Sequence, residues 1–148
     1  MQADPAIIFK LAAEVERWPL FLPHYRWVHL LDSSANGQRK RVEMAARRDG
    51  IPLRWTAMQE LFPAEGRITF RHVRGPTRRM WVEWTLTPGP DGVQVRITHD
   101  FSPAWGRVPL GNFVAQHIIG ESFVGNVANR TLRCIKVTAE AADRVARG

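Results

Sequence analysis

Two histidines occupy positions that belong to apolar series in the sequence. Within residues 67–74 and 93–101, apolar residues alternate with polar ones, and His72 and His99 fall among the apolar ones. Imidazole suits general acid–base chemistry because its unperturbed pKa, about 6.5, lies near neutrality. These residues are therefore candidates for orienting a ligand or moving protons. The alternative interpretation is that each is a buried or rim histidine with an ordinary hydrogen-bond partner.

A third histidine, His117, lies on the inner side of a predicted helix, one turn before Glu121. Glu121 is placed to fix the tautomer of His117 or to accept its proton. Tyr25 adds an auxiliary hydrogen-bond donor to the same group of candidates.

Three histidines could also hold zinc. However, a further predicted strand, residues 79–87, separates the strands of His72 and His99, which places them about 9–10 Å apart. Zinc requires ligand nitrogens about 2.0–2.1 Å from the metal. We therefore predict no metal site, and no cofactor.

The elements that must position these residues follow one order: two short helices, six strands and one long helix. Asp4 is a suitable N-cap and Pro5 suits the first position of a helix that continues toward Val15, and a short second helix covers 18–23. Closely spaced turn signals then predict an antiparallel meander. The predicted strands are 25–32, 38–48, 51–62, 67–74, 79–87 and 93–101, and the long helix is about 112–146.

The predicted sheet has one apolar face, and the last helix is the only large element that can cover it. The sequence has six tryptophans, and large flat aromatic rings at inward positions indicate either a thick core or the wall of a cavity. The predicted cavity residues are Trp55, Gln59, Phe70, Trp84, Phe101 and Phe113.

The bulk properties limit the class of protein. A length of 148 residues suits one domain, 1–148, and no apolar run is long enough to span a membrane. Cys134 is the only cysteine, which favours a reducing cytoplasm. The net charge of +7 would also suit nucleic acid, but tryptophans that point inward offer no exposed stacking platform, so nucleic acid is not the expected partner.

Most of the excess positive charge is arginine. In the predicted meander, the turns near residues 48–50 and 75–79 and the loop 102–111 lie at one end of the sheet. An arginine-lined cavity mouth there would favour an anionic ligand or an acidic carrier protein. The alternative is a generally basic surface. The residues concerned are Arg47, Arg48, Arg74, Arg78, Arg79 and Arg107.

The order of elements resembles that of the polyketide cyclase/dehydrase and lipid-transport group of the START (SRPBCC) superfamily. The likeness spans nearly the whole chain, and its motifs are Val15-Glu16-Arg17-Trp18-Pro19 leading to Tyr25, then Trp55, Trp84, and Thr131-Leu132 with Lys136. The resemblance implies an α+β helix-grip (Bet v 1-like) fold, in which a curved antiparallel sheet wraps around the C-terminal helix and encloses an apolar cavity.

The sequence departs from the family pattern in two ways. Members usually begin with a strand, whereas only three residues precede Asp4, so the first family strand is missing from this sequence. Either the true start lies upstream of Met1 or the sheet is completed in another way, and an open sheet edge would favour a homodimer. In the aromatase/cyclase members that this sequence resembles, the strand that corresponds to the Trp55 strand carries an arginine on its cavity face. Gln59 stands at that position here. The cavity tyrosine of those members is matched by Tyr25.

Two functions follow from the resemblance. The first is a polyketide cyclase/dehydrase (aromatase/cyclase) activity on a hydrophobic substrate, with the cavity providing proximity and Tyr25 and the histidines providing protons. The second is binding or transfer of a lipid, quinone or pigment without chemistry. Both require a hydrophobic small molecule as the partner.

Overall fold

The computed structural model describes residues 1–48, 50–101 and 110–148; the side chains of residues 48, 101 and 110–124 are outside this description. The chain begins with α1 (Pro5–Ala13), followed by a 3-10 turn (Val15–Arg17) and α2 (Trp18–Phe21). As predicted, Asp4 caps α1, because its carboxylate accepts a hydrogen bond of 2.7 Å from the backbone N–H of Ala6.

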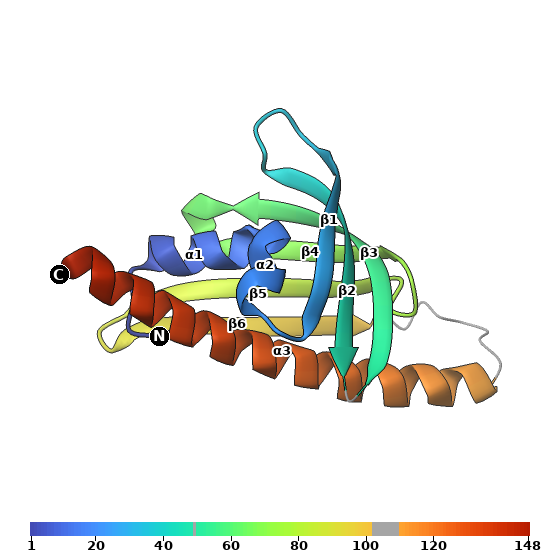
Figure 1. Cartoon of the computed structure of the whole chain (residues 1–148). Coiled ribbons are helices and arrows are strands. Elements are labelled where there is room, and N and C mark those ends of the chain that lie inside the picture. The colour runs from blue at the N-terminus through green and yellow to red at the C-terminus, as the bar shows by residue number, and fades with distance from the viewer. Residues whose placement is uncertain (49, 102–109) are drawn as a thin grey trace.

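Six strands form one antiparallel sheet in the order β1-β2-β3-β4-β5-β6, which is the predicted meander. Figure 1 shows that the sheet is strongly curved and that α1 and α2 lie inside its curve. Each strand matches its predicted range to within about two residues. The strands are β1 (Tyr25–Ser33), β2 (Arg39–Arg48), β3 (Ile51–Phe62), β4 (Arg67–Arg74), β5 (Met80–Gly89) and β6 (Gly92–Phe101).

The long helix α3 (Leu110–Arg147) runs across the open side of the curved sheet (Figure 1). On its inner side, Val127, Ile135 and Ala139 are buried in the same core as residues of the sheet and of α1. None of the helices in the described part of the chain is long and apolar enough to cross a membrane.

The N-terminal residues fasten α1 to the rest of the fold. Met1 exchanges two backbone hydrogen bonds with Val93 of β6, of 2.7 and 2.9 Å. The backbone N–H of Gln2 donates to Glu140, and that of Asp4 donates to the buried carboxylate of Asp143. Over the residues described, no strand precedes α1.

Candidate ligand cavity

A cavity lies between the concave face of the sheet and α3, and its walls are mainly apolar. It measures about 70 Å³, enough for a few water molecules or a small ring, whereas sites for drug-sized ligands measure ~300–1,000 Å³. Its aromatic walls are Trp18, Tyr25, Trp55, Phe70 and Trp84, its aliphatic ones Met44, Met80, Val82, Ile97, Val127 and Ala128, and its polar ones His72, Thr77, His99 and Thr131.

His72 projects from β4 into this cavity and is held in two ways. Its Nδ1 atom lies 2.7 Å from the hydroxyl of Thr77, and its ring stacks on the indole of Trp55. Burial lowers the pKa of His72 to about 3, with a smaller contribution from the nearby His99, so the ring is neutral at pH 7. A neutral imidazole in an apolar wall offers a ligand one polar contact without the cost of a buried charge.

His99 reaches the same cavity from β6 and is only partly buried. Burial lowers its pKa as well. The strands of the two histidines flank β5, as the sequence predicts. Among the residues described, no group of three or more histidine, cysteine or acidic side chains is arranged to hold a metal ion.

Tyr25 also lines the cavity wall, as does Thr131 of α3. Burial raises the pKa of the Tyr25 hydroxyl, and its hydrogen bond with Thr131 acts in the opposite direction to a smaller extent. Behind Thr131 lies His24, which is 2% exposed and places its Nε2 atom 2.8 Å from the threonine hydroxyl. Burial, assisted by the positive charge of Arg130, lowers the pKa of His24 to about 4.

The candidates predicted from sequence do not include His24 or Thr77. His24 lies between α2 and β1, where no alternation pattern applies, and Thr77 lies in the turn between β4 and β5. The signal for Thr77 was its closeness in sequence to His72 across a tight turn.

Most of the described candidates come together. Tyr25, Trp55, Phe70, His72, Trp84 and His99 all line the cavity. Gln59 does not: it is fully buried, and its amide nitrogen donates a 3.0 Å hydrogen bond to the carbonyl of Ala13 at the end of α1. Gln59 points to the same face of β3 as Trp55. It lies nearer the end of the strand, however, where α1 covers this face in place of the cavity. The side chains of Phe101, Phe113, His117 and Glu121 lie outside the described residues.

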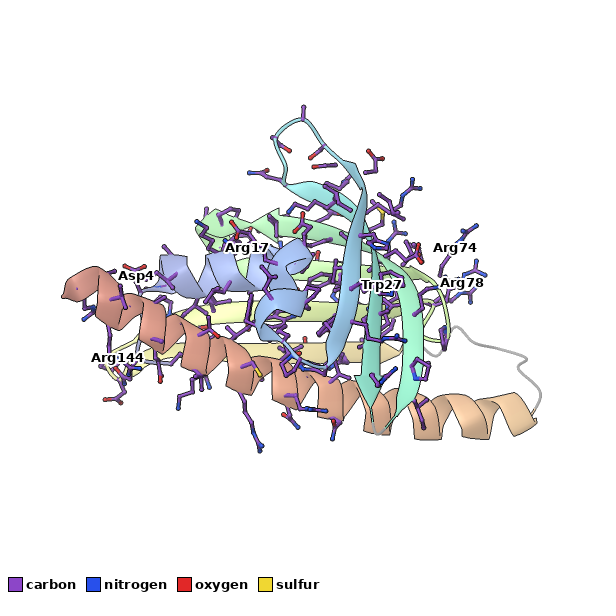
Figure 2. All side chains as sticks on the ribbon, viewed as in Figure 1. Asp4, Arg17, Trp27, Arg74, Arg78 and Arg144 are labelled. Carbon is purple, nitrogen blue, oxygen red and sulfur yellow. The ribbon has the colours of Figure 1, made fainter. Side chains whose placement is uncertain are left out.

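The arginines of the predicted mouth are only partly described. Figure 2 shows Arg74 and Arg78 close together at the end of the sheet where β4 turns into β5, and both are exposed. Thr77, which lines the cavity, belongs to the same turn. Arg79 adopts a positive φ of 76°, and its backbone N–H donates to the carbonyl of His72. Arg47 is exposed near the end of β2, whereas the side chains of Arg48 and Arg107 lie outside the described residues.

Comparison with known sequences matches residues 1–121 to the family described as polyketide cyclase / dehydrase and lipid transport. The bifunctional cyclase/dehydratase of the actinorhodin polyketide synthase from Streptomyces coelicolor is 32% identical over 103 residues, covering 68% of this chain and 32% of that protein. Its counterpart for granaticin from Streptomyces violaceoruber is 31% identical over 106 residues, covering 69% and 32%. The chain thus matches about a third of the length of these relatives.

Solved structures show the same fold. The Zhui aromatase/cyclase from Streptomyces sp. R1128 superposes with a TM-score of 0.78 at 20% identity, over 99% of this chain and 92% of that one. A START superfamily protein from Mycobacterium smegmatis gives a TM-score of 0.65 at 16% identity, over 96% and 93%. These matches confirm the predicted helix-grip architecture.

Proposed function

Because this chain belongs to the polyketide cyclase/dehydrase and lipid-transport family, we propose that its cavity binds a hydrophobic poly-ketone and promotes its cyclisation and dehydration. The observation that carries the proposal is the pair of neutral histidines, His72 and His99, in the wall of an otherwise apolar cavity. Poly-ketone chains are apolar but carry regularly spaced carbonyl groups. This wall offers apolar surface for the chain and a few polar side chains for its carbonyl groups.

The two histidines suit different roles. Thr77 and Trp55 hold His72 in place, so it orients a carbonyl group of the ligand. His99 is less buried and is the better candidate for proton transfer. In the proposed reaction it accepts a proton from a methylene group between two carbonyls. The resulting carbanion forms a carbon–carbon bond to a ketone of the same chain, the alkoxide takes up a proton, and loss of that hydroxyl with a neighbouring proton releases water.

The small volume of the cavity limits how such a chain enters. Met44 and Met80 line the wall, and both are unbranched side chains that can change rotamer at little cost. We therefore expect these methionines to move when a poly-ketone chain binds.

The basic turn at Arg74 and Arg78 suits delivery of the substrate by an acidic carrier protein, because both arginines are exposed next to the cavity residue Thr77. The homodimer expected from the sequence stays a prediction that light scattering would test.

Binding or transfer of a hydrophobic molecule without chemistry is the second candidate, and Gln59 favours it. This residue stands where the resemblance implies a catalytic arginine, yet it donates to Ala13 and takes no part in the cavity wall. A cavity that lacks that cation has less means to stabilise a developing negative charge.

The two candidates differ in the products that form. A minimal polyketide synthase that releases poly-ketone chains would be incubated with this protein, and the cyclised products would be separated by liquid chromatography with mass spectrometry. For the proposed activity, we expect wild-type protein to shift the products toward one aromatic compound, and His99→Ala to reduce this shift at least about tenfold. His29→Ala, at an exposed position on β1, is the matched control.

Native mass spectrometry of the purified protein completes the test. Retention of a hydrophobic molecule with an unchanged product distribution would support the second candidate. An empty protein that leaves the products unchanged would contradict both.

A further inference from the structure

The side of α3 that faces away from the sheet carries a row of exposed apolar residues. Val137, Ala141 and Val145 are spaced by four residues, so their side chains follow one another along the helix. All three are exposed, Val137 by 68% and Val145 by 83%. None of them packs on the core, whereas Ile135 and Ala139 of the same helix are fully buried. A single exposed valine needs no explanation, but a row of apolar residues on one helix indicates a surface for an interaction.

Arginines lie beside this row. The helix turns by about 100° per residue, which places Arg130, Arg133 and Arg144 within about 40° of Val137 around the helix axis. All three arginines are exposed. Apolar and cationic side chains thus share one surface, which we call the outer surface of α3. Its residues are Arg130, Arg133, Val137, Ala141, Arg144 and Val145.

The two acidic residues in this part of α3 are engaged elsewhere. Glu140 accepts a 2.8 Å hydrogen bond from the backbone N–H of Gln2. Asp143 is buried, accepts from the backbone N–H of Asp4 and pairs with Arg147 at 2.7 Å. Within the described part of the chain, no carboxylate lies within ion-pair distance of the arginines of the outer surface. The outer surface therefore keeps a positive charge.

The outer surface is also close to the cavity. Figure 1 shows that α3 forms one side of the molecule, with the sheet and α1 on its other side. The inner side of α3 supplies Val127, Ala128 and Thr131 to the cavity wall. A helix with its side chains is about 10–12 Å across. A flat partner that lies along the outer surface is therefore separated from the cavity by about one helix diameter.

Exposed valines and arginines on one helical face match the boundary of a lipid bilayer. There, apolar side chains enter the acyl region while cations meet anionic headgroups. Nucleic acid provides phosphates for arginines, but its bases stack on aromatic rings and gain little from an aliphatic row. We propose that the outer surface of α3 docks this protein on an anionic phospholipid membrane, with the helix lying in the plane of the interface. This mode differs from a membrane span, for which no described helix is long and apolar enough.

Docking in this orientation places the cavity beside the lipid. With the cavity as the ligand site, as the proposed function has it, a hydrophobic ligand then passes between bilayer and cavity over a short distance. Membrane binding itself does not require a ligand, so it can be measured on the protein alone.

The first experiment measures co-sedimentation of the full chain with vesicles. We expect equal parts of phosphatidylcholine and phosphatidylglycerol to bind the protein at least about tenfold more tightly than phosphatidylcholine alone. Arg133→Glu combined with Arg144→Glu should weaken binding to the mixed vesicles at least about tenfold. The matched control is Arg74→Glu with Arg78→Glu, which changes the net charge equally at the end of the molecule opposite Arg144. Its affinity should fall less than about threefold at physiological salt, because distant charges are screened.

The second experiment tests the apolar row. Val137→Ser combined with Val145→Ser should weaken vesicle binding about tenfold, because two valine side chains no longer enter the acyl region. This loss should persist at high salt, where the contribution of the arginines is screened. Leu31→Ser with Ile51→Ser, which changes exposed apolar residues of the sheet, is the matched control and should bind like wild type. Circular dichroism melting confirms that each variant is folded.

Loss of binding in both α3 variants, with both controls retained, would support the proposal. Wild-type binding that ignores lipid charge, or equal binding by the two arginine variants, would overturn it. So would two further outcomes. Binding of single-stranded DNA that depends on Arg133 and Arg144, without vesicle binding, would assign the surface to nucleic acid. A dimer that dissociates in the valine variant, measured by light scattering, would assign it to a second copy. None of these measurements involves a cavity ligand, so a negative result leaves the proposed function standing.

Discussion

The imidazole of His72 lies parallel to the indole of Trp55, with ring centroids 5.7 Å apart and planes inclined by only 5°. The stack fixes the plane of the imidazole, and the 2.7 Å contact with Thr77 fixes its rotation within that plane. Two residues from different elements thus set the direction of Nε2 before any ligand arrives. Such preorganisation lowers the entropic cost of binding.

Removing the hydroxyl of Thr77 should disturb this arrangement. We expect Thr77→Val to lower the free energy of unfolding by about 1–3 kcal/mol, because Nδ1 of the buried His72 loses its partner. Urea denaturation would measure the change. The control is Thr98→Val, whose hydroxyl is exposed and makes only a long contact of 3.4 Å, and its effect should stay below about 0.5 kcal/mol. Equal effects of the two variants would contradict the role given to Thr77.

The buried histidines should make the protein sensitive to acid. The pKa is about 4 for His24 and about 3 for His72 in the folded protein, below the unfolded value of about 6.5. As the pH falls below 6.5, the unfolded chain therefore binds more protons at these two histidines than the folded chain does. The stability that the neutral histidines contribute is fully present above this pH and is lost as the pH falls toward their folded pKa values. Between pH 7 and pH 5, each of the two should reduce the free energy of unfolding by about 2 kcal/mol.

Urea denaturation at several pH values tests this prediction. Asparagine does not titrate, so His72→Asn should show a shallower decline between pH 7 and pH 5 than wild type, whatever its stability at pH 7. His29→Asn, at an exposed site, should follow the wild-type curve. Parallel curves for wild type and His72→Asn would show that His72 protonates as easily when folded as when unfolded.

Gly75 allows the basic turn to approach β3. Its φ is +101°, and an added Cβ would lie 2.6 Å from the carbonyl oxygen of Arg54 and 3.0 Å from the backbone of Trp55. Gly75→Ala should therefore cost at least about 2 kcal/mol, from backbone strain together with a clash against an unyielding strand.

Gly37 provides the matched control, since its φ is +70° but an added Cβ would have no neighbour within 4 Å. Gly37→Ala should cost about 1 kcal/mol from backbone strain alone. Thermal unfolding of both variants measures the difference. If the two variants melted together, the contact with β3 would not be what requires glycine at position 75.

Much of the fold could be predicted because its signals are local. Turn residues and alternating apolar residues placed all six strands, and alternation placed His72, His99, Trp55 and Trp84 on the inner face of the sheet. The Asp4–Pro5 pair located the start of α1. Each of these signals depends on residues within about one turn or one strand of one another.

The rest of the site depends on contacts between distant segments. Alternation places Gln59 on the inner face, but it does not reveal that α1, rather than the cavity, covers that end of β3. His24 lies in a connection, and its contact with the cavity residue Thr131 forms only because α3 brings that threonine to within 2.8 Å of it across 107 residues of sequence. No local pattern encodes such a pair.

The exposed arginines beside the cavity should matter for association with an acidic carrier protein. Reversing Arg74 and Arg78 together to glutamate should lower the association rate with such a partner about tenfold or more at low salt, because both charges lie at the turn that carries Thr77. The effect should shrink at high ionic strength, where charges more than about 8–10 Å apart are screened.

The control variant replaces Arg133 and Arg144 on α3 with glutamate, which changes the net charge by the same amount as replacing Arg74 and Arg78. Both are exposed, and Figure 2 shows Arg144 at the end of the molecule opposite Arg74 and Arg78. Stopped-flow mixing of each variant with a fluorescently labelled acyl carrier protein gives the rates. If only the overall charge of +7 attracts the partner, both double variants should slow association alike. A loss confined to Arg74 and Arg78 would mean that the carrier protein docks at the turn next to the cavity, where a tethered substrate could enter.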